Sequence, residues 1–143
     1  MVVKLAWVFA VVFLLIGVLG FVPGITADGH LLGIFEVDLL HNIIHLATGV
    51  LAALAAWKGV ELSRRFFQVF GVVYALVTVV GFVQGDTVLG LVGVNMADNI
   101  LHLAVAVVAL AAGFFLKGDS MGGGPAPMAA TPSNEGGNIG GGM

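Results

Sequence analysis

The sequence predicts an all-α integral membrane protein, a four-helix bundle built from two repeated helix–loop–helix hairpins. The first observation behind this prediction is composition, because 59 % of the 143 residues are hydrophobic and only 9 % are charged. A soluble domain carries roughly 25 % charged residues, so this chain cannot cover its own surface in water. The second observation is a set of four long apolar runs, and the third is an internal repeat that matches the first pair of runs to the second.

Each apolar run has the length of a membrane-spanning helix, which is about 17 to 25 residues. The runs are continuous rather than alternating, which favours helices over the strands of a membrane barrel. The predicted helices cover residues 5–22, 39–57, 66–83 and 96–116. We expect residues 1–117 to form the membrane domain and the Gly- and Pro-rich residues 118–143 to form a disordered cytoplasmic tail.

All basic residues fall on one side of this topology, namely Lys4, Lys58, Arg64, Arg65 and Lys117. The predicted loops over residues 23–38 and 84–95 contain no Lys or Arg. The positive-inside rule therefore places the N-terminus and the C-terminus in the cytoplasm. We expect a multi-pass protein of the inner (plasma) membrane, with those two loops outside.

The two halves of the chain resemble each other. Residues 33–46 match residues 90–103, and Gly20-Phe21-Val22 matches Gly81-Phe82-Val83. Each half contains two crossings and so returns to the side from which it started. The halves therefore have the same orientation, which predicts a pseudo-twofold axis along the membrane normal.

Several short motifs accompany this repeat. Residues 20–24 read Gly-Phe-Val-Pro-Gly, residues 32–37 read Leu-Gly-Ile-Phe-Glu-Val, and Asn-x-x-His-Leu occurs at residues 42–46 and 99–103. With these motifs the chain resembles, over roughly residues 4–116, an uncharacterised family of bacterial four-helix membrane proteins, domain of unknown function 4383. The resemblance implies a fold and a topology. It brings no activity, cofactor or catalytic residue.

The second and fourth predicted helices each carry one stripe that is polar at the outer end and small further in. Asp38 and Asn95 stand where N-caps are expected, and Asn95 with Asp98 has the spacing of a capping box. Small residues allow helix backbones to approach closely in lipid. We therefore expect these two helices to meet at the centre of the bundle through their stripes.

The polar parts of the two stripes supply the candidate site residues. One interpretation is structural: Asn42, His45, Asn99 and His102 form one interhelical hydrogen-bond network across the axis and fix the bundle. Under this interpretation the protein has a structural or interaction role. His45 and His102 would each lie about 10 Å below the outer start of their helices.

Three ligand-based interpretations stay open beside the structural one. His41, His45, Asp98 and His102 offer three imidazoles and a carboxylate, which suit Zn²⁺ or another first-row metal ion. His45 and His102 could instead hold a haem. Polar residues within a membrane also mark proton or small-solute paths.

The sequence also argues against several classes of function. It lacks a nucleophile–base spacing, a phosphate-binding loop and cysteines, so we expect no enzyme. The formal net charge of −3 and the scattered basic residues argue against a nucleic-acid partner. The expected partners are the lipid bilayer and a membrane protein or a second copy of the chain.

Overall fold

The computed structural model describes residues 1–116, so the predicted tail over residues 118–143 lies outside the described residues. Four helices confirm the predicted fold class. They are α1 (Val2–Leu19), α2 (Leu39–Lys58), α3 (Val60–Gln84) and α4 (Met96–Phe115). Each helix is long and apolar enough to cross a membrane. The chain is therefore a multi-pass membrane protein.

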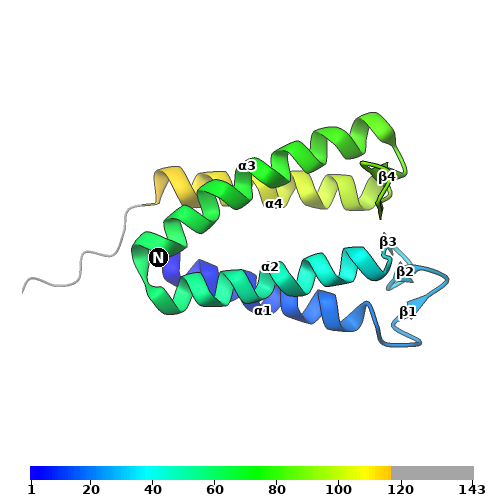
Figure 1. Ribbon diagram of the computed structural model, residues 1–143, viewed down its shortest axis with the longest axis horizontal. Coiled ribbons are helices and arrows are strands. Elements are labelled where there is room, and N and C mark those ends of the chain that lie inside the picture. Colours follow the sequence, from blue (N-terminus) through cyan, green and yellow to red (C-terminus); the bar gives the residue numbers. More distant parts are fainter. Residues whose placement is uncertain (117–143) are drawn as a thin grey trace, which may run out of the picture.

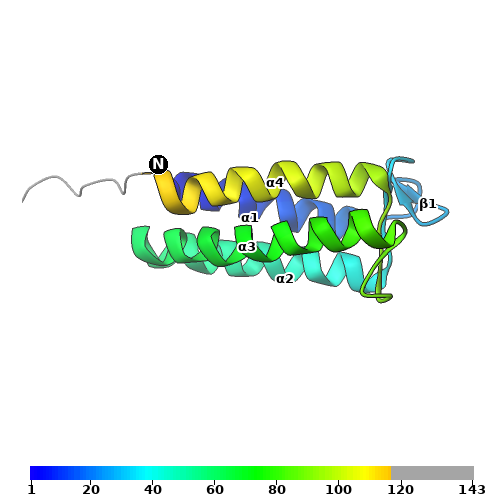
Figure 2. The ribbon, with the colours of Figure 1, turned by 90° about the horizontal axis from the view of Figure 1, so that it is seen from above.

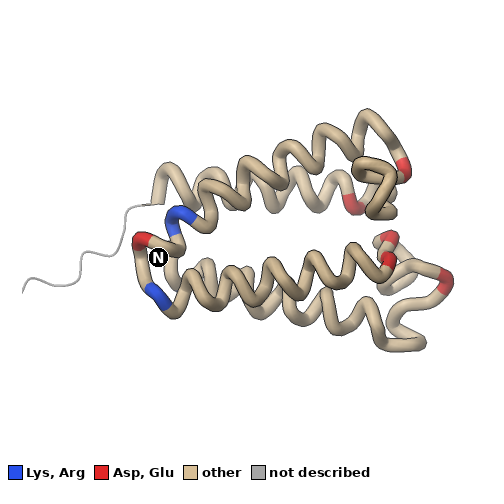
Figure 3. Tube along the Cα trace, viewed as in Figure 1, with Lys and Arg blue, Asp and Glu red and all other residues tan. Residues whose placement is uncertain are grey.

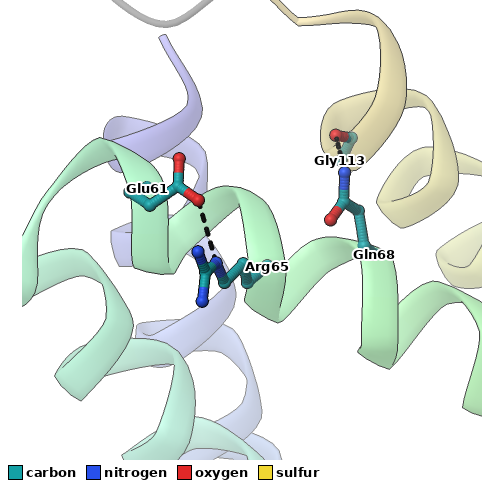
Figure 4. A network of polar contacts seen from close by, with 4 residues as sticks. All are labelled: Glu61, Arg65, Gln68 and Gly113. Carbon is teal, nitrogen blue, oxygen red and sulfur yellow. Dashed lines mark hydrogen bonds and ion pairs between the residues drawn. The ribbon is translucent and has the colours of Figure 1, made fainter.

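The largest differences from the predicted helix boundaries are in α1 and α3. α3 begins at Val60 rather than at residue 66, because its first turns are charged and extend the helix beyond the apolar run. In these turns Arg65 Nε donates a hydrogen bond to Glu61 Oε1 at 2.8 Å (Figure 4). α1 ends at Leu19 rather than at residue 22, since the next residues form a tight turn in which the Val22 N–H donates to the Leu19 carbonyl.

The helices pair as two hairpins, with α1 against α2 and α3 against α4 (Figures 1 and 2). The small residues serve this packing within each hairpin: a Cβ at Gly49 would lie 2.7 Å from Leu14 of α1, and one at Gly113 would lie 2.9 Å from Gln68 Cγ of α3. Gln68 Nε2 also donates to the Gly113 carbonyl at 3.0 Å (Figure 4). The small-residue parts of the α2 and α4 stripes therefore pack within their own hairpins and not on each other as expected.

The centre of the bundle explains this correction, because aromatic side chains of α1 and α3 fill it. The rings of Phe9 and Phe67 meet edge to face with centroids 4.9 Å apart, and Phe13 meets Phe70 in the same way at 5.5 Å. α2 and α4 contribute mainly alanines to this core. The large rings of one hairpin therefore pack on those of the other, while the small residues of α2 and α4 lie beside them.

Both loops at the far end of the bundle contain short strands that the sequence did not predict. β1 (Thr26–Ala27), β2 (His30–Leu31) and β3 (Phe35–Glu36) form an antiparallel sheet in that order, and β4 (Thr87–Val88) pairs with β5 (Val92–Gly93). We call this the strand end of the bundle. Both β2–β3 and β4–β5 turn through a Leu-Gly pair with positive φ at both residues, as a type I′ turn requires. The two halves thus share a turn, while the predicted pseudo-twofold axis stays a prediction.

Charged residues gather at the two ends of the bundle (Figure 3). Most acidic residues lie at the strand end, whereas Lys and Arg lie at the end where α2 joins α3 (Figure 3). At that second end Arg64 Nη2 donates to the Leu116 carbonyl at 2.7 Å, which ties α3 to the last turn of α4. The middle of each helix carries no Asp, Glu, Lys or Arg, as expected in a hydrocarbon environment.

Candidate functional site

The two hairpins are joined at the strand end by four hydrogen bonds, which we call the latch. Two involve Gly93: its N–H donates to Asp38 Oδ2 at 2.7 Å, and its carbonyl lies 3.1 Å from His41 Nδ1. The latch joins Asp38 and His41 to Gly93, Glu36 to Asp98, and Asn95 to Ile34. A Cβ on Gly93 would lie 2.8 Å from Glu36 Oε1, so a larger residue here would require the Glu36 side chain to move.

The latch uses the same residues that begin α2 and α4. Asp38 is the N-cap of α2 and accepts the His41 N–H at 2.7 Å, while Asn95 caps α4 in a capping box with Asp98. These capping predictions are confirmed. Asp98 Oδ2 accepts both the Asn95 N–H and the Glu36 N–H at 2.9 Å. Each carboxylate therefore caps its own helix and binds the backbone of the other hairpin.

Three imidazoles converge just below the latch. His41 and His45 come from α2 and His102 comes from α4, and their ligand nitrogens all lie within 4.8 Å of one another. We call these residues the imidazole cluster. Their exposed fractions are 3 %, 8 % and 6 %, so all three are more than nine-tenths buried. The cluster thus places three metal-ligand side chains from two hairpins in one buried volume.

Hydrogen bonding fixes one tautomer in the imidazole cluster. The Gly93 carbonyl can only accept, so His41 Nδ1 carries the proton and His41 Nε2 keeps its lone pair. By contrast, His45 Nδ1 and His102 Nδ1 are buried and make no hydrogen bond within residues 1–116. A buried nitrogen without a partner is costly, which marks these two atoms as places where a ligand would be stabilised.

Aromatic rings from the other two helices enclose the imidazole cluster. Phe13 of α1 meets His45 edge to face at 5.5 Å between centroids, and Tyr74 of α3 meets His102 at 5.3 Å. All four helices therefore contribute to the surroundings of the cluster. These ring contacts contribute to the burial of His45 and His102.

An apolar cavity of about 690 Å³ lies between α2 and α3 and ends at the imidazole cluster. His41 and His102 line this end, whereas His45 does not line the cavity. Val88, Val92 and Val94, from β4–β5 and the residue after it, border the same end. The cavity extends along both helices to Leu62 and Arg65, near the start of α3. We call it the α2–α3 groove.

The structure corrects the predicted four-residue polar network. Asn42 packs against Gly20, which follows α1, and Asn99 packs against Gly81 of α3, so each amide faces its own hairpin. Their Oδ1 atoms make no hydrogen bond among the described residues. No hydrogen bond joins the four predicted network residues within residues 1–116, so the predicted network is not confirmed. Only His45 and His102 of the predicted four come together in the imidazole cluster.

One of the four predicted metal-ligand residues lies outside the imidazole cluster. Three of its four members, His41, His45 and His102, form the imidazole cluster. Asp98 is not part of this group, and its Oδ2 atom accepts two backbone N–H groups in the latch. The carboxylate expected as a ligand is therefore a structural acceptor.

A comparison with protein-family models matches residues 4–115 to the domain of unknown function DUF4383. The match covers most of the chain and confirms the resemblance noted in the sequence. The chain belongs to this family. No curated protein and no solved structure matches the DUF4383 chain.

Sequence reasoning did not find several parts of this DUF4383 site. It noted Tyr74 only as a polar residue of the third helix, and it assigned no role to Phe13 or Gly93. One signal for Gly93 was available, because it takes the place of Glu36 in the repeat. A glycine that replaces a glutamate in one half suggests that the other half approaches its backbone closely.

Asp38 provides a test of the latch in this DUF4383 protein. Burial raises the pKa of Asp38, but the N–H groups of His41 and Gly93 outweigh it, so the pKa lies below the ordinary 3.8. The stabilisation from this carboxylate is therefore fully present above pH 3.8 and is lost as the pH falls through the lower folded-state value. We predict that Asp38→Asn lowers the free energy of unfolding by about 1–3 kcal/mol at neutral pH.

Thermal unfolding in detergent micelles, followed by circular dichroism, checks this prediction. The difference in unfolding temperature between the parent and Asp38→Asn should shrink as the pH falls below 3.8. The reason is that the parent carboxyl then also becomes neutral. Asp86→Asn, in the exposed loop of the second hairpin, is the matched control and should leave the unfolding temperature unchanged. A difference in unfolding temperature that stays constant with pH would contradict the claim that the charged form of Asp38 stabilises the latch.

Proposed function

We propose that this small membrane protein binds one first-row divalent metal ion at the imidazole cluster, and that the ion joins its two hairpins. The observation that carries the proposal is the convergence of three buried imidazoles from α2 and α4 within 4.8 Å. Imidazole is the usual nitrogen ligand for zinc, copper, iron and nickel. A zinc–nitrogen bond of about 2.0–2.1 Å in tetrahedral geometry brings the ligand nitrogens to about 3.3 Å. Binding of an ion would therefore draw the three imidazoles closer together than the 4.8 Å described above.

The hydrogen bond of His41 supports this proposal. Metal-binding histidines usually donate their other ring N–H to a carbonyl or carboxylate, which fixes the tautomer and the orientation of the ring. His41 Nδ1 has the Gly93 carbonyl in that role at 3.1 Å and presents Nε2. The unpartnered Nδ1 atoms of His45 and His102 are consistent with nitrogens that pair with an ion instead.

An ion fits this site better than a haem. A haem held by His45 and His102 needs space for a porphyrin between the two rings. His41 lies beside both of them, with ring centroids 4.6 Å from His45 and 5.9 Å from His102. The third imidazole therefore occupies part of the space that a porphyrin plane would need. Three imidazoles with a fourth position left over is instead a common arrangement for a zinc-type ion.

We also infer that the strand end, and with it the proposed metal site, faces the outside of an inner (plasma) membrane. The charge distribution supports this orientation, because Lys and Arg lie at the opposite end of the bundle (Figure 3). Positively charged loops remain in the cytoplasm. In this orientation both termini are cytoplasmic, and the ion would be taken up from the outer side.

Metal binding can be measured on the purified protein. We predict that metal-free protein in detergent micelles binds one equivalent of Zn²⁺ by isothermal titration calorimetry. His102→Gln should lose this binding, because it removes the only described ligand from α4. His30→Gln is the matched control, since His30 is the one histidine outside the cluster and contacts the Asp28 carbonyl.

The contrary results of this experiment are clear. Equal Zn²⁺ binding by the parent and His102→Gln would contradict a shared site between α2 and α4. A Soret band in the absorption spectrum of the purified parent would show that the protein binds a haem and would contradict the proposed metal ion. Unfolding temperatures that do not change with Zn²⁺ would also count against an ion that joins the hairpins, because a ligand that binds only the folded state must stabilise it.

Topology reporters test the orientation. A cytoplasmic reporter fused after Lys117 should be active, and the same reporter inserted at Gly29 should be inactive. A reporter that works only outside the membrane should give the opposite pattern at the two positions. An active external reporter after Lys117 would reverse the orientation and place the strand end in the cytoplasm.

A further inference from the structure

We propose that the α2–α3 groove binds a long-chain carboxylate, a free fatty acid, whose carboxylate occupies the open position of the metal ion. This inference rests on the proposed metal site and names its ligand. The tail would lie along the groove, away from the strand end. Three features carry the inference: which imidazoles face the groove, the charge that the ion brings, and the length and lining of the groove.

The groove reaches the imidazole cluster at His41 and His102. His41 and His102 line its end, whereas His45 lies behind them and does not line it. An ion held by the three imidazoles therefore has its fourth position toward the groove. Zinc sites with three protein ligands keep such a position for an exchangeable ligand. A molecule in the groove can reach the ion without displacing an imidazole.

Charge complementarity selects the head group. Imidazole binds metal ions in its neutral form, so three imidazoles leave the double positive charge of the ion uncompensated. A buried charge in apolar surroundings is costly unless it is paired. Asp38 and Asp98 are held by backbone N–H groups of the latch, and neither joins the ligand group. A carboxylate from the groove supplies the missing negative charge, which a neutral head group does not.

The lining of the groove selects the tail. Between its ends the groove is bordered mainly by aliphatic and aromatic side chains of α2 and α3, namely Ile44, Leu51, Leu54, Val69, Val73 and Val77. From Leu62 to Val77 it follows α3 for about 22 Å, given a rise of about 1.5 Å per residue. One leaflet of a bilayer core is about 15 Å thick, so a lipid tail fits this length.

The groove is also open to the bilayer. Val69 and Val73 line it and keep exposed fractions of 66 % and 48 %, on a helix face that meets lipid. A fatty acid dissolved in the membrane can therefore enter sideways. At the far end Arg65 is already paired with Glu61 at 2.8 Å, which leaves the ion as the stronger attraction for a carboxylate.

Cobalt provides a direct readout, because the visible absorption of Co²⁺ responds to its ligands. Protein loaded with Co²⁺ in maltoside micelles would be titrated with palmitate. We expect a saturable change in the Co²⁺ bands with palmitate, and none with hexadecanol, which has the tail alone, or with acetate, which has the head alone. Val73→Trp, which fills the groove, should keep the Co²⁺ spectrum and weaken palmitate binding by at least about tenfold.

Val72→Trp is the matched control. Val72 has the same exposed fraction as Val73, 48 %, but it does not line the groove. This variant should bind palmitate as the parent does. If both substitutions weaken palmitate binding equally, the groove is not the binding site of the tail. If hexadecanol changes the Co²⁺ bands as palmitate does, the carboxylate is not the group that binds the ion.

The same titration separates the two proposals. If Co²⁺ binds and palmitate leaves its spectrum unchanged, the fatty-acid inference is wrong and the metal site stands. If Co²⁺ does not bind to the parent, the metal site and the inference that rests on it are both wrong.

Discussion

The backbone of Gly93 connects the two halves of this molecule. Its N–H donates to the carboxylate that caps α2, and its carbonyl accepts from the first imidazole of the same helix. Elsewhere the hairpins meet mainly through aromatic rings of α1 and α3, which are large and fill the centre. Among the described hydrogen bonds, the latch joins the start of α4 directly to the first hairpin, while Ser63 Oγ of α3 donates to the Ala55 carbonyl of α2 at the opposite end. The imidazole cluster depends on the position of α4 relative to α2, because His102 comes from the second hairpin alone.

The latch also resolves a conflict that membrane proteins face at helix starts. The first N–H groups of a helix need acceptors, and carboxylates near the bilayer need donors. In this bundle one set of residues meets both needs, since Asp38 and Asp98 accept N–H groups of their own helix and of the opposite hairpin. At this end of the bundle, four buried side-chain atoms make no hydrogen bond among the described residues: His45 Nδ1, His102 Nδ1, Asn42 Oδ1 and Asn99 Oδ1. The two amides pack within their own hairpins, whereas the two imidazoles converge between the hairpins.

Much of the fold follows from the sequence, because lipid makes composition and run length decisive. The four helices, the caps at Asp38 and Asn95 and the family were predictable from apolar runs and short motifs. The contacts between helices were not predictable. A stripe of small residues such as Gly49 indicates that a helix packs closely, but it does not indicate which neighbouring helix it packs against. For the same reason the histidines could be selected by spacing, while the roles of Asp98 and Asn42 could not. Both depend on backbone atoms that approach from distant segments, namely Glu36 and Gly20.

The central claim is that the latch holds the two hairpins in one register. The chain has no cysteine, so spin labels can be placed at Leu39→Cys and Met96→Cys, which begin α2 and α4 and are 66 % and 62 % exposed in the parent. The measurement is the distribution of distances between the labels by double electron–electron resonance, with and without Asp38→Asn and Asp98→Asn together. The account predicts one narrow distribution in the labelled parent and a broad one once both carboxylates are replaced. An unchanged narrow distribution in the double replacement would contradict it.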